Sequence, residues 1–189
     1  MTKNIIKHGK VNLGTGTVVE DNVVLGHLED GVLTIGDNSI IRSGTVIYSN
    51  VKIGNNFKTG HNVLGRENTE IGDNVLIGTN SVVDGNCTIG RNVSVQTNVY
   101  VTAYTTLEDD VFMGPCSVTT NDKYMQVGAK LKGPLIKKGT KIGANSTILP
   151  AIIIGEQAVV GSGSVVTRDV PAKATVVGNP AKQIKGKPR

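Results

Sequence analysis

The sequence predicts an all-β fold in which short parallel strands wind into a three-sided prism. Three observations predict it: aliphatic residues recur every six positions, turn residues recur every 18 positions, and only 3% of the 189 residues are aromatic. Large aromatic side chains normally bury much of the area in a globular core. Their scarcity here indicates that a repeated aliphatic ladder forms the interior instead, as is typical of solenoid proteins.

The six-residue period extends over most of the chain. Its central series keeps its spacing even at Thr59 and Gly65, the two positions where no aliphatic residue occurs. Because side chains alternate between the two faces of a strand, one residue of each six-residue segment is expected to point inward. The inward aliphatic positions are Leu13, Val19, Leu25, Ile35, Ile41, Ile47, Ile53, Ile71, Ile77, Val83, Ile89, Val95, Val101, Leu107, Met113, Ile136, Ile142, Ile148, Ile154, Val160 and Val166.

Turn residues recur with a longer period of 18, which equals three six-residue segments. Gly36-Asp37-Asn38 is followed by Gly54-Asn55-Asn56 and then by Gly72-Asp73-Asn74. Three segments per coil predict a prism with three edges, and Gly or Asn at each corner tolerates a positive φ. Stacked coils lie about 4.8 Å apart, so residues 18 positions apart are expected to form ladders along each edge.

The composition favours a soluble, cytoplasmic protein with one domain over residues 1–189. The net charge is +5 and 38% of the residues are hydrophobic, which is unlike a disordered chain. No run approaches the roughly 18 apolar residues of a membrane span, and charges near the N-terminus argue against a signal peptide. Cys87 and Cys116 are too few for a disulfide scaffold. Dispersed basic residues and scarce aromatic residues argue against nucleic-acid binding.

A loop and a tail interrupt or follow the repeats. The repeats are expected over about 11–118 and 136–170, followed by a short C-terminal tail at 171–189. Between the repeats the spacing of inward residues grows to 23, so a loop at about 119–135 is expected to leave the prism. Such a loop is either a tolerated surface insertion or a functional flap. Its polar residues and Tyr124 favour a flap over a substrate cleft.

The second of the three edges carries the residues best suited to acyl transfer. A hydroxyl acceptor needs a general base, for which histidine with its ordinary pKa of about 6.5 is suited, whereas a neutral amine attacks without one. His61 and Asn98 lie two coils apart, roughly 9–10 Å by the strand spacing. Either His61 is the base, or the chemistry lies nearer Gln96 and Asn98; both His61 and Asn98 are otherwise ordinary turn residues. This edge holds Ser43, His61, Thr79, Thr97 and Pro115, each with the residue after it.

The repeats and the C-terminal segment resemble those of the hexapeptide-repeat acyltransferases. That segment comprises Asp169-Val170-Pro171-Ala172-Lys173 and Val176-Val177-Gly178-Asn179-Pro180-Ala181-Lys182, and the resemblance covers about residues 11–182. It implies a left-handed parallel β-helix of about seven to eight coils, against the usual right-handed crossover. It also implies transfer of an acetyl group from acetyl-CoA.

Part of the sequence is similar to the branch of this family that N-acetylates amino sugars carried on nucleotides. The resemblance implies that Asn98 and Asn121 belong to the substrate site, and Gln96 and Tyr124 are expected to bind the substrate beside them. The expected reaction is direct attack of the amine on the thioester, with no acyl-enzyme at Cys116. The similar residues are 92–99, 107–115 and Thr120-Asn121.

The resemblance also implies a homotrimer that binds acetyl-CoA in grooves between its subunits. Small residues in the C-terminal coils let the extended pantetheine approach the backbone, and the cations are expected to meet the CoA phosphates. The implied partners are therefore acetyl-CoA, an amino-sugar nucleotide and two further copies of the chain. The residues assigned to the groove are Ala144, Gly161, Ser162, Arg168, Lys173, Asn179 and Lys182.

Three other functions are possible on the same prism. A metal enzyme like the γ-class carbonic anhydrases needs three histidines from neighbouring coils, but the chain has three in all and His8 lies outside the repeats; no metal is expected. A non-catalytic, ice-binding solenoid needs a regular threonine ladder, which His61 and Pro115 interrupt. An O-acetyltransferase acting on a sugar or small alcohol would use His61 as its general base.

Overall fold

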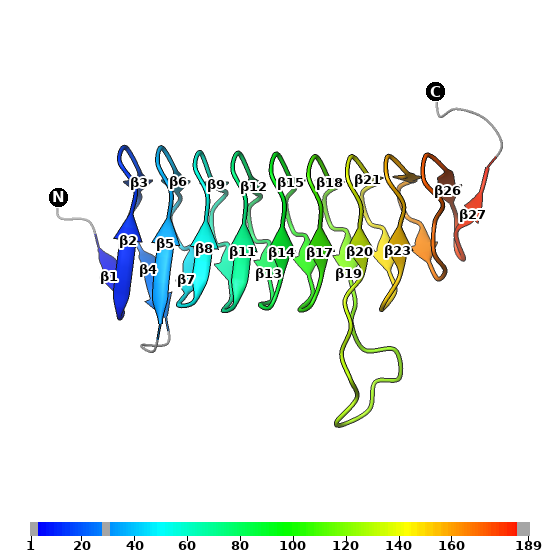
Figure 1. Cartoon of the computed structure of the whole chain (residues 1–189), viewed down its shortest axis with the longest axis horizontal. Coiled ribbons are helices and arrows are strands. Elements are labelled where there is room, and N and C mark those ends of the chain that lie inside the picture. The colour runs from blue at the N-terminus through cyan, green and yellow to red at the C-terminus, as the bar shows by residue number, and fades with distance from the viewer. Residues whose placement is uncertain (1–3, 28–30, 185–189) are drawn as a thin grey trace.

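The structure is a computed structural model, and it describes residues 4–27 and 31–184. Short strands stack into a long prism, with β1 and β27 at its opposite ends (Figure 1). The described residues contain no helix, and so none that could cross a membrane. The parallel β-helix predicted from the repeats is confirmed.

Three sheets form the sides of the prism. Sheet A consists of β1 (Ile5–Lys7), β4 (Val23–His27), β7 (Val46–Tyr48), β10 (Leu64–Gly65), β13 (Val82–Val83), β16 (Tyr100–Val101), β19 (Val118–Thr119), β22 (Thr147–Ile148) and β25 (Val165–Val166). Sheet B consists of β2 (Lys10–Leu13), β5 (Val32–Ile35), β8 (Val51–Ile53), β11 (Thr69–Ile71), β14 (Thr88–Ile89), β17 (Thr106–Leu107), β20 (Leu135–Ile136) and β23 (Ile153–Ile154). Sheet C consists of β3 (Val18–Val19), β6 (Ile40–Ile41), β9 (Lys58–Thr59), β12 (Leu76–Ile77), β15 (Ser94–Val95), β18 (Phe112–Met113), β21 (Lys141–Ile142), β24 (Val159–Val160), β26 (Thr175–Val177) and β27 (Lys182–Gln183), of which β27 pairs antiparallel.

The prism has about nine coils, because sheet A contains nine strands, whereas the repeats predicted seven to eight. The additional strands lie at the ends. Residues Ile5–Lys7 pair with β4 ahead of the first hexad, and β26 continues sheet C after the last one. Both are held by backbone pairing. In β1 the inward position that pairs with Leu25 is Lys7, which is not aliphatic, and β26 does not keep the six-residue spacing, so a count of aliphatic residues misses both.

The interior is the inward series predicted from the six-residue period. Ile41, Leu107 and Met113 are completely buried. Thr59 and Gly65, which occupy the inward position at the two interruptions of the series, are buried as well. Each fully buried aliphatic side chain contributes about 1.5–3 kcal/mol to folding. A ladder of such residues therefore replaces the aromatic core of an ordinary domain.

The corners form three edges with regular hydrogen bonding. The first edge lies between sheets B and C, the second between sheets C and A, and the third between sheets A and B. On the first edge Asn56, Asn74 and Asn92 have φ values of 57° to 58°. Their side-chain amides link successive coils at 3.0 and 3.1 Å. Asparagine tolerates this left-handed conformation, so the first edge is built from turn chemistry, as its sequence indicates.

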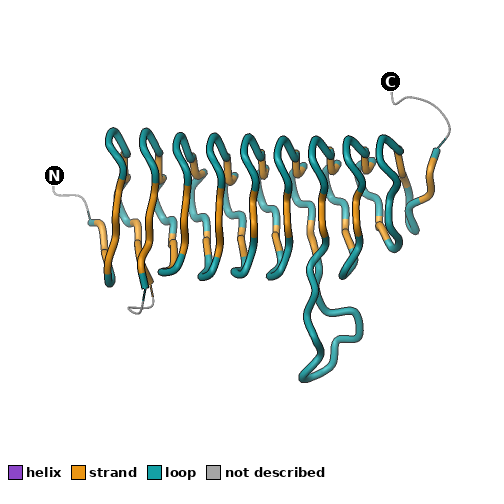
Figure 2. Tube along the Cα trace, in the orientation of Figure 1, coloured by secondary structure: helices purple, strands orange, loops and turns teal. Residues whose placement is uncertain are grey.

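Within the described residues one long loop, 120–134, leaves the prism between β19 and β20 (Figure 2). The chain returns in register, since Thr106 and Leu107 of β17 pair with Leu135 and Ile136 of β20. The coil therefore closes as if the loop were absent, and the loop projects from the third edge.

Candidate active site

A pocket lies at the base of this loop, against the outer face of sheet A. Its floor is apolar and includes Val118, Leu149 and Ile152, while polar groups from the start of the loop form one rim. An apolar concavity with a few polar groups at its margin is the usual form of a small-molecule site. The lining residues are Tyr100, Thr102, Val118, Thr119, Thr120, Asn121, Asp122, Lys123, Met125, Leu149, Pro150, Ile152 and Thr167.

Asn121 fixes the base of the loop at the pocket rim. Its side-chain amide donates to the backbone carbonyl of Ala103 at 3.3 Å, and its backbone carbonyl accepts from the backbone N–H of Lys132 at 2.8 Å. The carboxylate of Asp122 then accepts from the backbone N–H of Tyr124 and Met125, at 3.0 and 2.8 Å. The two ends of the loop are thereby tied together, and Asn121 lies in the pocket.

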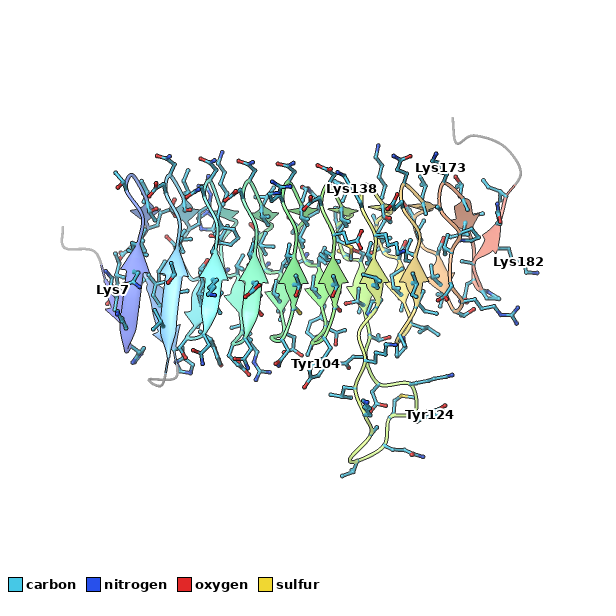
Figure 3. The ribbon with its side chains drawn as sticks, viewed as in Figure 1. Lys7, Tyr104, Tyr124, Lys138, Lys173 and Lys182 are labelled. Atoms are coloured by element: carbon cyan, nitrogen blue, oxygen red, sulfur yellow. The ribbon has the colours of Figure 1, made fainter. Side chains whose placement is uncertain are left out.

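Tyr124 lies on the loop away from the stack of coils (Figure 3). It is 66% exposed, and its ring faces the ammonium group of Lys123 at 5.5 Å. Val127, near the tip, is fully exposed. Tyr124 therefore does not line the pocket of its own chain, and the loop presents apolar side chains outward, as surfaces that contact another molecule often do.

The second edge holds His61 and Asn98 two coils apart, with Thr79 between them. The backbone N–H of His61 donates to Thr79 Oγ1 at 3.2 Å, and the N–H of Asn98 donates to the Thr79 carbonyl at 2.9 Å. Both side chains are exposed, and Asn98 has a φ of 58°. Gln96 donates to Ser94 Oγ at 2.8 Å, which holds it beside the edge. None of the three lines the loop pocket.

His61 lies near an ionised carboxylate. Glu20 accepts hydrogen bonds from the backbone N–H and the hydroxyl of Ser43, at 3.0 and 3.1 Å. The backbone hydrogen bond is the main cause that lowers the pKa of Glu20, and Arg42 and His61 add attraction. Within the described residues, no three histidine, cysteine or carboxylate groups are grouped as metal ligands.

Three of the residues assigned to the acetyl-CoA groove continue this second edge. The N–H of Asn145 donates to the Pro115 carbonyl at 2.9 Å, and the N–H of Gly163 donates to the Ala144 carbonyl at 2.8 Å. Ala144, Gly161 and Ser162 thus lie along the same edge as His61 and Asn98, in the C-terminal coils. A Cβ at Gly161 would come within 2.7 Å of Val177 Cγ1, so the Val177 side chain packs closely over this glycine.

The remaining groove residues lie elsewhere on the prism. Arg168 follows Thr167 of the loop pocket, on the third edge. Lys173 has a φ of 62° and sits on the first edge, where its N–H donates to the Glu156 carbonyl at 2.8 Å (Figure 3). Asn179 precedes a cis peptide bond in the turn before β27, and Lys182 begins that strand. One chain therefore does not bring the three predicted cations together.

The repeats match a known family. Residues 50–85, 68–103 and 133–168 match the model described as bacterial transferase hexapeptide (six repeats). The chain carries the hexapeptide repeats of this family. The left-handed β-helix expected from the resemblance is therefore the fold of this protein.

The curated relatives of this hexapeptide-repeat protein include a sugar-nucleotide N-acetyltransferase. It is 62% identical over 52 residues to a dTDP-3-amino-3,6-dideoxy-alpha-D-galactopyranose 3-N-acetyltransferase of Aneurinibacillus thermoaerophilus, which covers 28% of this chain and 27% of that protein. It is 30% identical over 179 residues to the bifunctional protein GlmU of Thermosipho africanus, which covers 95% of this chain and 32% of that protein. The matches thus span about a third or less of these relatives.

The fold is shared with a solved acyltransferase. The structure of LpxA, a UDP-N-acetylglucosamine acyltransferase from Bacteroides fragilis, superimposes with a TM-score of 0.81 at 16% sequence identity. The superposition covers 97% of this chain and 73% of that one. At this identity the likeness concerns the fold alone.

Sequence reasoning did not place Tyr100 in the site, although this residue lines the loop pocket of the hexapeptide-repeat protein. Two signals were present in the sequence. Aromatic residues are scarce, and Tyr100 follows the Gln96–Asn98 turn at an outward-facing position of its hexad. Its hydrogen bond to Asp84 joins side chains from neighbouring coils, and the repeat does not specify how outward side chains orient.

Proposed function

We propose that this hexapeptide-repeat protein transfers the acetyl group of acetyl-CoA to the amino group of a sugar carried on a nucleotide. The observation that carries the proposal is the loop pocket, whose apolar floor and Asn121 rim suit a sugar ring with polar substituents. The local identity with a dTDP-amino-sugar N-acetyltransferase supports the same class of acceptor. The proposed location is the cytoplasm, which supplies acetyl-CoA.

The proposed reaction is a direct transfer. The neutral amine attacks the thioester carbonyl carbon, and the resulting oxyanion collapses with cleavage of the C–S bond. The amine loses one proton and the CoA thiolate takes one up. Neither Asn98 nor His61 lines the loop pocket of its own chain, so in this proposal Asn98 of a second copy would donate its amide to the oxyanion, and His61 of that copy would contact another part of the substrate. Cys116 is exposed but lies three coils from His61, so this histidine cannot activate it as a nucleophile.

Acetyl-CoA is expected to lie along the second edge of the C-terminal coils. Ser162 is exposed there, and a Cβ at the neighbouring Gly163 would meet open space, so an extended chain can approach the backbone. Arg168 and Lys173 lie on the two other edges. If these cations bind the CoA phosphates, at least one of them must come from a second copy of the chain.

A homotrimer is proposed for the same reason, and sheet A is its proposed interface. The outward side chains of sheet A form an apolar row over the four coils that precede the loop pocket, whereas the corresponding row of sheet B is polar. Together with the exposed apolar residues of the loop, this row favours burial against another copy. The row of sheet A is Val24, Val46, Leu64 and Val82, and that of sheet B is Thr34, Lys52, Glu70 and Thr88.

A substrate panel tests the proposed acceptor. The protein is incubated with acetyl-CoA and dTDP- or UDP-linked amino sugars, the matching hydroxyl sugars, or simple alcohols, and release of CoA thiol is followed. Turnover with the amino sugars and not with their hydroxyl analogues is expected. Turnover with the alcohols alone would exclude N-acetylation.

An O-acetyltransferase is the second candidate, and the surroundings of His61 favour it. An imidazole near the Glu20 carboxylate is suited to take a proton from a hydroxyl. In that case the rate should fall as the imidazole becomes protonated at acid pH. The hydroxyl arms of the panel detect this activity directly.

A further inference from the structure

Tyr100 forms the side of the loop pocket that faces the N-terminal coils. It begins β16 and points outward from sheet A, where it pairs with Val82 on one side and Val118 on the other. Val118 belongs to the pocket floor, and Tyr100 itself is 37% exposed. Among the described residues that line the pocket, Tyr100 is the one aromatic ring.

A chain of charged hydrogen bonds holds this ring in place. Tyr100 Oη donates to Asp84 Oδ2 at 2.7 Å, and Arg66 Nη1 donates to Asp84 Oδ1 at 3.0 Å. Arg66 also donates to both carboxylate oxygens of Glu67, at 3.2 and 2.9 Å, and lies over the ring of Tyr48 at 5.8 Å. Bonds of this kind are short and strong, so the orientation of the Tyr100 side chain is fixed before any ligand binds.

A ligand in the pocket would meet the aromatic ring of Tyr100, whereas the charged groups of this network are paired with one another. Arg66 is opposed by the two carboxylates of Glu67 and Asp84, which makes it a poor phosphate site. Both oxygens of Asp84 already accept a hydrogen bond. A pyranose presents flat C–H faces that pack on an aromatic ring, while its hydroxyl groups bond to polar side chains such as Asn121.

We propose that Tyr100 binds the sugar ring of the acceptor and that Asp84 and Arg66 are positioning residues for it. The inference rests on the proposed transfer of an acetyl group to a sugar. A side chain already held in its bound orientation loses less freedom on binding. The network should therefore lower the KM for the acceptor and leave the chemical step unaffected.

Steady-state kinetics with acetyl-CoA and dTDP-3-amino-3,6-dideoxygalactose test the role of Tyr100. Tyr100→Phe keeps the ring and loses the bond to Asp84, so the acceptor KM should rise about 5- to 10-fold. The values of kcat and of the KM for acetyl-CoA should stay within about twofold. Asp84→Asn should have a similar effect, and the double variant should be no worse than either, because both changes weaken one interaction. Tyr100→Ala, which removes the ring, should raise the acceptor KM further than Tyr100→Phe does.

Tyr104→Phe is the matched control. It makes the same chemical change at a tyrosine that is 50% exposed and does not line the loop pocket. Its kinetics should equal those of the unsubstituted protein. Thermal unfolding of each variant separates a lost contact from a lost fold.

The inference is overturned if Tyr100→Phe and Tyr100→Ala leave the acceptor KM unchanged, or if the KM for acetyl-CoA rises equally. Failure of the proposed function gives a different result. The unsubstituted protein would then acetylate an alcohol and no amino-sugar nucleotide, and an unchanged KM of the variants for that alcohol would refute the role of Tyr100 as well. If no acceptor is acetylated and calorimetry detects no binding of the dTDP-sugar, both proposals are wrong.

Discussion

The backbone N–H of Asn55 donates a hydrogen bond to Oδ1 of Asp73, one coil further on, at 2.7 Å. Asp37 and Asn55 repeat this link at 2.8 Å, so each corner side chain satisfies a backbone donor of the preceding coil. Asp73→Ala should lower the free energy of unfolding by about 0.5–1.5 kcal/mol. Asp73→Asn keeps an accepting oxygen and should cost less. Urea unfolding measures both.

Arg91 provides the control for this corner, because it occupies the same position one coil after Asp73 and its side chain has no acceptor. Its exposed ion pair with Asp109, at 3.4 Å, contributes at most about 1 kcal/mol. Arg91→Ala should therefore change stability less than Asp73→Ala does. Equal effects of the two substitutions would contradict the role of the corner hydrogen bond.

Gly65 interrupts the inward series at a place that has room for a side chain. A Cβ there would lie 3.8 Å from Ile47 Cγ2, an ordinary van der Waals distance. Gly65→Ala should raise the free energy of unfolding by about 0.5–1 kcal/mol, because it restricts the unfolded chain without strain. Gly60→Ala should instead lower the melting temperature, since its Cβ would overlap the backbone N of Thr79. Stabilisation by both substitutions, or by neither, would contradict this difference.

The periodic features of the fold could be predicted because they depend on spacing. Thr59 and Gly65 keep the inward spacing and are buried, as the six-residue count requires. The pocket could not be predicted in the same way. Its rim depends on how the loop folds back at Asn121, and its aromatic side depends on the orientation of Tyr100 toward Asp84. Neither is periodic, so the sequence predicted a site on the second edge and did not predict this pocket.

The second edge can be tested separately from the loop pocket. If Asn98 donates to the oxyanion, Asn98→Ala should lower kcat about 100-fold or more, since loss of one such donor costs about that much. His61→Ala should then affect chiefly the acceptor KM. If His61 is the base instead, His61→Ala should abolish most of the turnover. Full activity of both variants would show that the second edge is not the site of chemistry.

The two cysteines should differ sharply in reactivity. Cys87 is buried, and this burial raises the pKa of its thiol to about 11, so the reactive thiolate is scarce near neutral pH. Cys116 is exposed. Ellman's reagent should modify one thiol rapidly in the folded protein and two after unfolding. Cys116→Ser should abolish the rapid reaction, and a remaining rapid phase would show that Cys87 is accessible.

Stability at alkaline pH should depend on Tyr100. Burial, and then the hydrogen bond to Asp84, raise the pKa of Tyr100 from its ordinary value of 10.0 to about 12. The folded protein therefore holds the phenolic proton more tightly than the unfolded chain does. The contribution of Tyr100 to the free energy of unfolding is complete below pH 10 and is lost as the pH rises through about 12.

Urea unfolding across this pH range, with Tyr100→Phe for comparison, measures that contribution. The unsubstituted protein should lose stability more steeply between pH 10 and 12 than Tyr100→Phe, because the variant has no proton to release at this position. Tyr104→Phe should keep the steeper slope. The tyrosinate absorbance of the folded protein offers an independent measure, since Tyr100→Phe should remove absorbance that develops near pH 12. If that substitution removes absorbance that develops at lower pH instead, the hydroxyl of Tyr100 is not held by Asp84 in solution, and the fixed ring of the pocket loses its physical basis.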